Sequence, residues 1–228
     1  MQAIDYGRAR RVLARRDPII RDLMRVHGAC RLAQAQRSDP FRALCHAIIA
    51  QQLSNKASAT IEGRFAALFG GTPTPAAVAQ ATDEQLRAVG LSPQKLRYMR
   101  DLCARVQGGS LTLHELDALS DEDVIAALTS VKGIGRWTAE MFLIFRLHRP
   151  DVLPVDDLGI VNAVKRAYGL RARPTPARLT RIGEAWRPYR SVACWYLWAS
   201  LDPPPPKATA RLALRASTVT SAKKEQRT

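Results

Sequence analysis

The stretch VKGIGRWTAEM, from Val131 to Met141, places two glycines one residue apart directly before an amphipathic helical pattern. Glycine tolerates positive φ and the close approach of another backbone. The stretch therefore predicts a tight turn that buries Ile134 and leaves backbone amides pointing outward at the start of a helix. Such amides and the helix dipole favour an anion, and Lys132 and Arg136 flank the turn. An ordinary helix–helix connection explains the same spacing, so this pattern alone leaves the role of the turn open.

Apolar residues recur at three- and four-residue spacing along most of the chain. The segment from Phe41 to Ile49 is a clear case, because its apolar residues fall on one helical face. Asp17-Pro18 has an acid suited to an N-cap followed by proline at the first helical position. Ser54 can cap a further helix, and the glycines and proline of residues 70–73 end it. We find no alternation typical of strands, and the sequence predicts an all-α fold.

The charge of the chain points to a polyanionic partner. It has 35 Lys and Arg against 20 Asp and Glu, a net charge of +15 and a pI near 10.5. Neutralising phosphates releases condensed counterions, so such a balance is typical of nucleic-acid binding, although a merely basic surface would also give it. No run of eighteen apolar residues exists and no signal peptide precedes Asp5. We expect a cytoplasmic protein that acts on nucleic acid and not on a membrane.

The four cysteines argue against a metal centre. Cys30, Cys45, Cys103 and Cys194 stand in separate segments, without a CxxC pair or a histidine-rich companion. The sequence therefore predicts no zinc, no iron–sulfur cluster and no required cofactor. Cys45 and Cys103 fall at apolar positions of helical patterns, so we expect buried thiols in a reducing compartment.

Two adjacent acids, Asp156 and Asp157, stand where another helical pattern begins. A helix start favours the ionised form of a carboxylate. Both acids can be simple helix caps. Since one cap suffices, the second acid indicates a further role.

These motifs together resemble a known family. LTSVKGIGRWTAEMFLIF followed by VLPVDDLGI resembles the helix-hairpin-helix DNA glycosylases, and the similarity is closer to their alkylation-repair branch, the 3-methyladenine DNA glycosylase II family. The resemblance covers roughly residues 5–201 and extends through LARRDPII, FRALCHAIIAQQLSNKASATI, GLSPQKLRYMRDLCARV and WRPYRSVACWYLWASL. The chain departs from the family at Lys132, where the hairpin more often has proline. Its length leaves no room for the N-terminal β-domain of longer members, which suggests a compact, all-helical member.

The resemblance implies an organisation in two helical lobes with a DNA- and base-binding cleft between them. Residues 1–201 would form the glycosylase domain, with the N- and C-terminal helices in one lobe and about residues 45–150 mostly in the other. Residues 202–228 begin with a proline run and continue as a basic stretch, which we expect to be a flexible tail. That tail either contacts phosphates without specificity or has no function. We expect a monomer.

The resemblance also assigns roles to site residues. The hairpin would grip a phosphate of the lesion strand, often with an alkali cation on the carbonyls of Val131 and Ile134; its residues are Val131, Lys132, Gly133, Ile134, Gly135 and Arg136. Asp157 matches the catalytic aspartate, and Asp156 would then cap the helix. Gln51 and Gln52 match a loop that inserts a wedge residue into the duplex, with Gln52 the better candidate. Both glutamines could instead only satisfy a helix C-terminus.

Trp137 bears on the reaction. In the lyase-competent relatives the residue two past the second hairpin glycine is a lysine that attacks the sugar, and an indole cannot act as an amine nucleophile. The resemblance places Trp137, Met141 and Trp198 in the base pocket, although core packing is an alternative for each.

The expected function is base excision without strand cleavage. The enzyme would flip the nucleotide out of double-stranded DNA and hydrolyse the N-glycosidic bond of alkylated purines such as 3-methyladenine, 7-methylguanine or 1,N6-ethenoadenine. The alternatives are a non-catalytic hairpin DNA-binding module, a bifunctional glycosylase/lyase for oxidised bases, and a helical protein-interaction domain.

Overall fold

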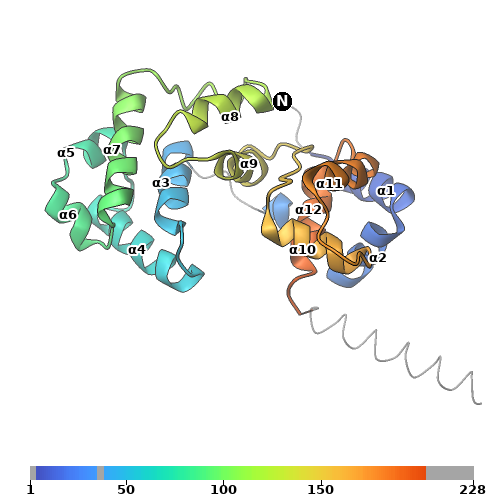
Figure 1. Ribbon diagram of the computed structural model, residues 1–228. Helices are drawn as coiled ribbons and strands as arrows, with labels where there is room; N and C mark the ends of the chain where they lie inside the picture. The colour runs from blue at the N-terminus through green and yellow to red at the C-terminus, as the bar shows by residue number, and fades with distance from the viewer. Residues whose placement is uncertain (1–3, 35–38, 204–228) are drawn as a thin grey trace, which may run out of the picture. The chain divides into compact units, whose positions relative to one another are not determined.

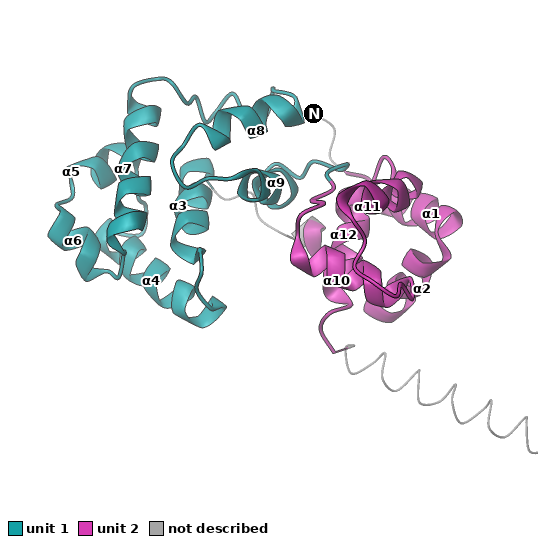
Figure 2. Cartoon of the chain, in the orientation of Figure 1, with its two compact units in different colours: residues 1–3, 35–152 teal, residues 4–34, 153–228 magenta. Residues whose placement is uncertain are grey.

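The computed structural model describes residues 4–34 and 39–203, and every regular element in these ranges is helical (Figure 1). The all-α prediction is confirmed. The predicted tail lies outside the described residues from position 204 onward. The chain divides into two compact units, of which unit 1 contains residues 39–152 and unit 2 contains residues 4–34 and 153–203 (Figure 2). Within the described ranges, no helix is both long and apolar enough to cross a membrane.

Unit 1 is built around α3, whose face predicted from the sequence is buried. Leu44, Ile48 and Ile49 are fully buried, and α3 packs against α4, α7 and α9. The helices of unit 1 are α3 (Pro40–Ala50), α4 (Asn55–Leu68), α5 (Pro75–Gln80), α6 (Asp83–Ala88), α7 (Pro93–Gln107), α8 (Asp121–Thr129) and α9 (Arg136–Phe145).

Side-chain caps begin α4, as the sequence predicts, and α6. The side chain of Ser54 accepts a hydrogen bond from the amide of Ala57 at the start of α4. Thr82 and Gln85 form a reciprocal capping box at the start of α6. Such caps satisfy amides that the first helical turn leaves without partners.

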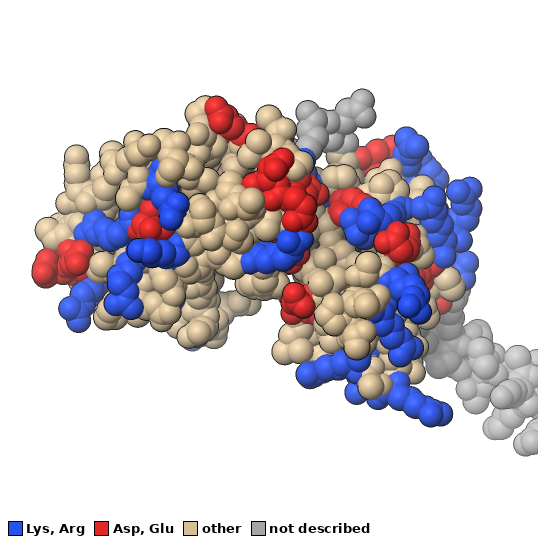
Figure 3. Space-filling model, turned by 45° about the horizontal axis from the view of Figure 1, so that its top comes forward, with Lys and Arg blue, Asp and Glu red and all other residues tan. Residues whose placement is uncertain are grey.

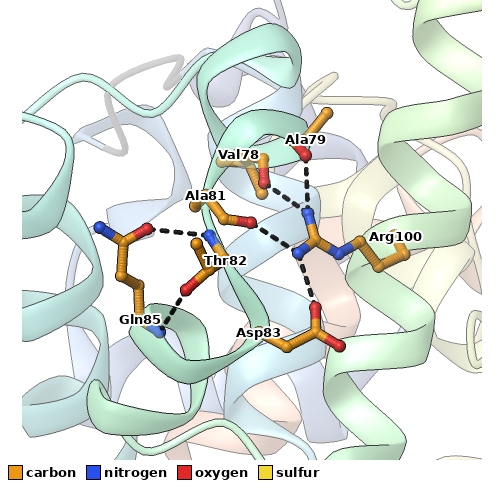
Figure 4. Close-up of polar contacts among 7 residues, drawn as sticks. All are labelled: Val78, Ala79, Ala81, Thr82, Asp83, Gln85 and Arg100. Carbon is orange, nitrogen blue, oxygen red and sulfur yellow. Dashed lines mark hydrogen bonds and ion pairs between the residues drawn. The ribbon is translucent and has the colours of Figure 1, made fainter.

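Arg100 of α7 holds the two short helices α5 and α6 in place. Its guanidinium donates to the carbonyl oxygens of Val78, Ala79 and Ala81, at 3.0, 2.8 and 2.6 Å (Figure 4). It also contacts the carboxylate of Asp83 at 2.7 Å. One side chain therefore satisfies the last carbonyls of α5 and an acid in the first turn of α6, where short helices have little stability of their own.

Unit 2 combines helices from both ends of the chain. Its core contains Trp186 and Tyr196, both fully buried, together with Leu13, Ile20 and Val164. The elements of unit 2 are α1 (Tyr6–Arg16), α2 (Pro18–His27), η1 (Arg31–Gln34), α10 (Leu158–Ala167), α11 (Pro176–Gly183), η2 (Glu184–Trp186) and α12 (Arg190–Ala199). The packed pairs include α1 with α2, α2 with α12, and α10 with α12.

Asp17 links the two ends of the chain inside unit 2. As predicted, it caps α2, where its Oδ1 accepts from the amides of Ile19 and Ile20. Its Oδ2 accepts from the hydroxyl of Tyr168, and from the indole N–H of Trp186 at 2.8 Å. Only 5% of Asp17 is exposed, so this buried carboxyl group is held by four donors.

Candidate nucleic-acid interface and active site

The glycine hairpin connects α8 to α9 and has the tight turn that the sequence predicts. Ile134 is 4% exposed and its amide donates to the carbonyl of Val131 at 3.1 Å. Gly133 has a φ of +81°, a conformation that favours glycine. A Cβ on Gly133 would lie 2.1 Å from the ring of Tyr98 on α7, so this position also requires glycine for close packing.

The loop after α3 supports the hairpin from a second direction. The side-chain amide of Gln51 donates to the carbonyl of Gly133 at 2.8 Å. Lys95 of α7 donates to the carbonyl of Ile49 at 2.7 Å, in the last turn of α3. The alternative that Gln51 only satisfies the end of α3 is therefore wrong, because the Gln51 side chain binds the hairpin instead.

Contrary to the prediction from the sequence, not all backbone amides of the hairpin point outward. The amide of Lys132 donates to Oδ2 of Asp101 at 2.9 Å, and the amide of Ile134 is used within the turn. Within the described part of the chain, the amides of Gly133, Gly135 and Arg136 donate to no group. Gly135 is the N-cap of α9 and has no side chain that could cap the helix. The N-terminus of α9 is therefore open to an anion.

The two basic side chains beside the hairpin differ in their surroundings. Arg136 binds both carboxylate oxygens of Glu122, at 2.6 and 3.0 Å, and contacts Glu140 at 3.2 Å. Its hydrogen bonds lower the pKa of Glu122, and Glu122 in turn raises the pKa of Arg136. The Lys132 ammonium lies 3.8 Å from Asp101 and its side chain is 71% exposed. Lys132 is thus the more accessible cation for a phosphate.

Asp101 keeps its charge beside the hairpin. Burial raises the pKa of this carboxyl group, but the hydrogen bonds from the Lys132 amide and from Arg105 outweigh that effect, and the pKa is lowered. The Arg105 guanidinium lies 2.8 Å from Asp101. An ionised Asp101 can therefore hold the first turn of the hairpin at neutral pH.

A groove of about 1040 Å³ opens on unit 1 beside the hairpin, and it contains part of the predicted base pocket. Trp137 and Met141 of α9 line it, and Trp137 is 49% exposed. Gln52 also lines the groove, is exposed and has a φ of +57°. The third predicted pocket residue, Trp198, belongs to α12 of unit 2, where it contacts Asp157.

The same groove contains an acid–base pair that we did not predict. Nδ1 of His46 on α3 lies 2.8 Å from Oε2 of Glu62 on α4, and both residues line the groove. The two residues are 16 positions apart in the sequence. No motif or helical spacing relates them, so only the packing of α3 on α4 could reveal the pair.

Asp157 is the N-cap of α10, and this corrects the role that we expected for Asp156. Its Oδ1 accepts from the amide of Ile160 at 2.7 Å and from the indole N–H of Trp198 at 2.9 Å. Only 8% of Asp157 is exposed, whereas Asp156 is exposed and does not cap the helix. The amide of Asp157 closes a turn onto the carbonyl of Pro154, which places the second acid and not the first at the helix start.

Gly159 makes the contact between Asp157 and Trp198 sterically possible. A Cβ on Gly159 would lie 3.0 Å from Oδ1 of Asp157 and 3.1 Å from the indole of Trp198. The carboxylate is therefore held in one orientation by a backbone amide, an indole and a close glycine. Such a fixed carboxylate can stabilise a positive charge that develops nearby.

The described residues contain no group of three or more His, Cys, Asp or Glu side chains that could hold a metal ion. All four cysteines are buried and none forms a disulfide bond, as expected for Cys45 and Cys103, and burial raises the pKa of both. For the predicted alkali cation, the carbonyl of Val131 accepts one bond from Ile134 and retains a second lone pair. Carbonyl oxygens suit a hard cation.

The hairpin buries Val131 and Ile134 and leaves open amides at the start of α9, and Asp157 is fixed at the start of α10. Both features are those of the helix-hairpin-helix base-excision proteins that the sequence resembles. A family model described as "HhH-GPD superfamily base excision DNA repair protein" matches residues 45–188. The chain belongs to this superfamily.

Similar proteins place the chain in the alkylation-repair branch and confirm that resemblance. It is 39% identical to the protein named DNA-3-methyladenine glycosylase 1 of Schizosaccharomyces pombe, over 72% of this chain and 73% of that protein. It is 33% identical to the protein named putative DNA-3-methyladenine glycosylase YfjP of Bacillus subtilis, over 71% of this chain and 59% of that protein.

Solved structures give the same result. A DNA-3-methyladenine glycosidase from Bacillus halodurans matches with a TM-score of 0.75 and 38% identity, over 83% of this chain and 87% of that one. The S. pombe 3-methyladenine DNA glycosylase Mag1, solved in complex with abasic DNA, also has a TM-score of 0.75. It is 35% identical over 84% of this chain and 95% of that one.

Proposed function

We propose that the protein is a monofunctional DNA glycosylase that hydrolyses the N-glycosidic bond of alkylated purines in duplex DNA and leaves an abasic site. The observation that carries the proposal is the fixed carboxylate of Asp157, held by Ile160 and Trp198 at the position that matches the catalytic aspartate of the family. The names of the relatives support the substrate class, and the complex of Mag1 with abasic DNA supports the product.

The chemistry follows from the charge of the substrate. A purine alkylated at N3 or N7 is cationic and leaves as a neutral base, taking the electron pair of the bond to C1′. Positive charge then builds on the deoxyribose, as in other glycosidic cleavages. The carboxylate of Asp157 stabilises that charge. Water adds to C1′ and gives up a proton, for which Asp157 is the proposed acceptor.

Trp137 limits the reaction to hydrolysis and helps to select the base. Its indole has no amine with which to form a Schiff base. It is 49% exposed and lines the groove of unit 1, so a base that enters the groove can contact the indole. Attraction between a cationic base and an aromatic face contributes about 0.5–2 kcal/mol. We therefore assign Trp137 and Met141 to the base pocket.

DNA binding in this proposal depends on the hairpin. The amides of Gly133, Gly135 and Arg136 would bind a phosphate together with the Lys132 side chain, and an alkali cation on the carbonyls of Val131 and Ile134 would add to the positive potential. Gln52 would fill the gap that the flipped nucleotide leaves. We also propose that the protein acts on DNA as a monomer in the cytoplasm.

The test is base release from duplexes that contain 3-methyladenine, 7-methylguanine or 1,N6-ethenoadenine, measured as abasic sites. Asp157→Asn keeps an oxygen acceptor for Ile160 and Trp198 but removes the charge. We expect it to lose at least about 100-fold in single-turnover rate while it still binds DNA. Asp156→Asn is the matched control and should retain activity. Full activity of Asp157→Asn would overturn the assignment of the carboxylate.

A second measurement separates hydrolysis from lyase chemistry. Borohydride added during turnover reduces a Schiff base to a stable adduct. We expect no covalent protein–DNA adduct and no strand cleavage before alkaline treatment. A trapped adduct would contradict the monofunctional proposal, and DNA binding without any base release would favour a non-catalytic module.

A further inference from the structure

The unit that contains the hairpin carries none of the net positive charge of the described residues. Among the described residues of unit 1, 39–152, there are 12 Lys and Arg against 12 Asp and Glu. The described residues of unit 2, 4–34 and 153–203, have 16 Lys and Arg against 7 Asp and Glu. In Figure 3, basic side chains spread over the face of unit 2, with acidic side chains among them. The hairpin therefore does not account for the basic character of the protein.

Helix α1 concentrates much of this excess. Five of its eleven residues are arginine and none is acidic. Arg8, Arg11 and Arg15 are all exposed and follow i, i+3, i+7 spacing, which places them on one face of the helix. Ala9 and Leu13 on the opposite face are fully buried. We call the three residues Arg8, Arg11 and Arg15 the α1 arginine face.

The α1 arginine face is not tied up in ion pairs. Within the described part of the chain, none of its three guanidinium groups makes an ion pair. The nearby N-cap acid, Asp5, accepts from the backbone amide of Arg8. Helix α2 differs, because there Asp22 pairs with Arg25 at 2.9 Å and lies 3.9 Å from Arg21.

Stability does not explain this arrangement. Like charges three and four residues apart destabilise a helix, and Arg8 lies near the positive end of the helix dipole. Arg15 is in the last turn, where the dipole favours a cation, but Arg8 and Arg11 gain nothing from it. Replacing these arginines with neutral residues would remove that repulsion without uncovering the core, because all three side chains are exposed. A binding role for the face is the physical alternative.

We propose that the α1 arginine face binds backbone phosphates of duplex DNA and is a second DNA contact, separate from the hairpin. The helical rise sets Arg8 and Arg15 about 10 Å apart along the axis. One DNA strand has a phosphate about every 3.4 Å along the duplex axis. A length of about 10 Å along that axis therefore carries about three phosphates of one strand, which is enough for the three arginines. Planar guanidinium groups suit such contacts because each can bind a phosphate bidentately. The proposal rests on the proposed function only in taking DNA as the polyanion.

Such a contact carries no sequence information and does not reach the reacting bond. It would raise the affinity for undamaged DNA and the rate of encounter with DNA, and it would make both strongly dependent on salt. The rate of base release from a saturated lesion complex would not depend on it.

The experiment replaces the whole face by Arg8→Gln, Arg11→Gln and Arg15→Gln in the full chain. The matched control removes the same charge from three exposed arginines of unit 1, by Arg64→Gln, Arg87→Gln and Arg97→Gln. Binding to an undamaged duplex is measured across a salt series. We expect the slope of log affinity against log salt to fall by about three for the α1 variant, at about 0.9 per contact, and by less than one for the control.

Two further measurements make the outcome decisive. Thermal unfolding should show that both variants fold, and single-turnover base release at saturating protein should equal that of the parent. Equal loss of slope in both variants would overturn the proposal, since net charge alone would then explain it. The proposal would also be overturned if the α1 variant bound DNA as the parent does but lost binding to anionic vesicles or to an acidic protein. If no variant and no parent releases a base, the proposed function fails while the binding result still decides this inference.

Discussion

The indole of Trp198 donates a hydrogen bond to Oδ1 of Asp157 at 2.9 Å, and the same oxygen accepts from the amide of Ile160. Trp198 thus positions the proposed catalytic carboxylate in unit 2, and its place in the base pocket stays a prediction. A side chain that orients a charge can affect the rate without touching the base.

Trp198→Phe should separate this positioning role from a stacking role. Phenylalanine keeps an aromatic ring but cannot donate to Asp157. A hydrogen bond to a charged group contributes about 1.5–3 kcal/mol, so we expect a loss of about 10- to 100-fold in single-turnover base release with little change in DNA affinity. Trp195→Phe on the same helix is the control and should have near-parental activity. Equal effects of the two substitutions would contradict the positioning role.

Gly135→Ala should test whether DNA approaches the hairpin backbone. No atom lies within 4 Å of a Cβ built on Gly135, so the free protein can accept the methyl group and should unfold at its normal temperature. If a phosphate binds the open amides, the methyl group will obstruct it, and we expect the dissociation constant for DNA to rise at least about tenfold, or about 1.4 kcal/mol.

Gly133→Ala is the contrasting variant, because its Cβ would lie 2.1 Å from Tyr98 at a φ of +81°. It should destabilise the fold itself. If Gly135→Ala binds DNA as tightly as the parent, phosphate does not bind at this turn.

Gln52→Ala should show whether the loop after α3 inserts into the duplex. Gln52 is exposed at a φ of +57°, and its side chain has no hydrogen-bond partner among the described residues. We expect slower base release from a paired lesion, with less effect on a lesion in an unpaired bulge where flipping is easier. Gln51→Ala should instead weaken DNA binding, because Gln51 holds the Gly133 carbonyl. Identical rates for Gln52→Ala and the parent on both substrates would remove Gln52 as the wedge.

Much of this architecture was predictable from local sequence. The acid and proline at Asp17-Pro18, the hydroxyl of Ser54 and the apolar face of α3 each specify a local conformation, and each prediction is confirmed. The glycine spacing of the hairpin predicted its turn for the same reason. Helix α5 is not predicted from the sequence, because six residues, half of them alanine, give almost no amphipathic pattern.

The contacts that tune the site were not predictable, because they join distant segments. Asp101 reaches the Lys132 amide across 31 positions, and Gln51 reaches Gly133 across 82. The choice of Asp157 over Asp156 as the cap depends on a turn closed on the Pro154 carbonyl. The local sequence allowed either acid to be the N-cap of α10, and only the path of the backbone determines which one is.

Asp17→Ala should be among the most destabilising substitutions in unit 2. It would leave the buried hydroxyl of Tyr168 without its acceptor, the indole N–H of Trp186 with only its longer bond to the Tyr168 oxygen at 3.2 Å, and α2 without its cap. We expect a loss of about 3–5 kcal/mol in the free energy of unfolding, measured by urea denaturation. Asp22→Ala, at a side chain that is 62% exposed, should change it by less than about 1 kcal/mol. A small effect of Asp17→Ala would mean that water replaces the carboxyl group.

Tyr168 should make the protein sensitive to alkaline pH. Burial, and then its hydrogen bond to Asp17, raise the pKa of the Tyr168 hydroxyl well above the ordinary value of a tyrosine. The folded state therefore keeps a proton that the unfolded chain loses above about pH 10, and stability falls as pH rises beyond that value. One retained proton gives a slope of about 1.4 kcal/mol per pH unit. Burial also raises the pKa of Tyr6 and Tyr196, each to about 12, so these residues add to the slope.

Tyr168→Phe should make the curve of unfolding free energy against pH less steep by one proton, in addition to any constant offset. Parallel curves for the variant and the parent would show that the Tyr168 hydroxyl is not held protonated in the native protein.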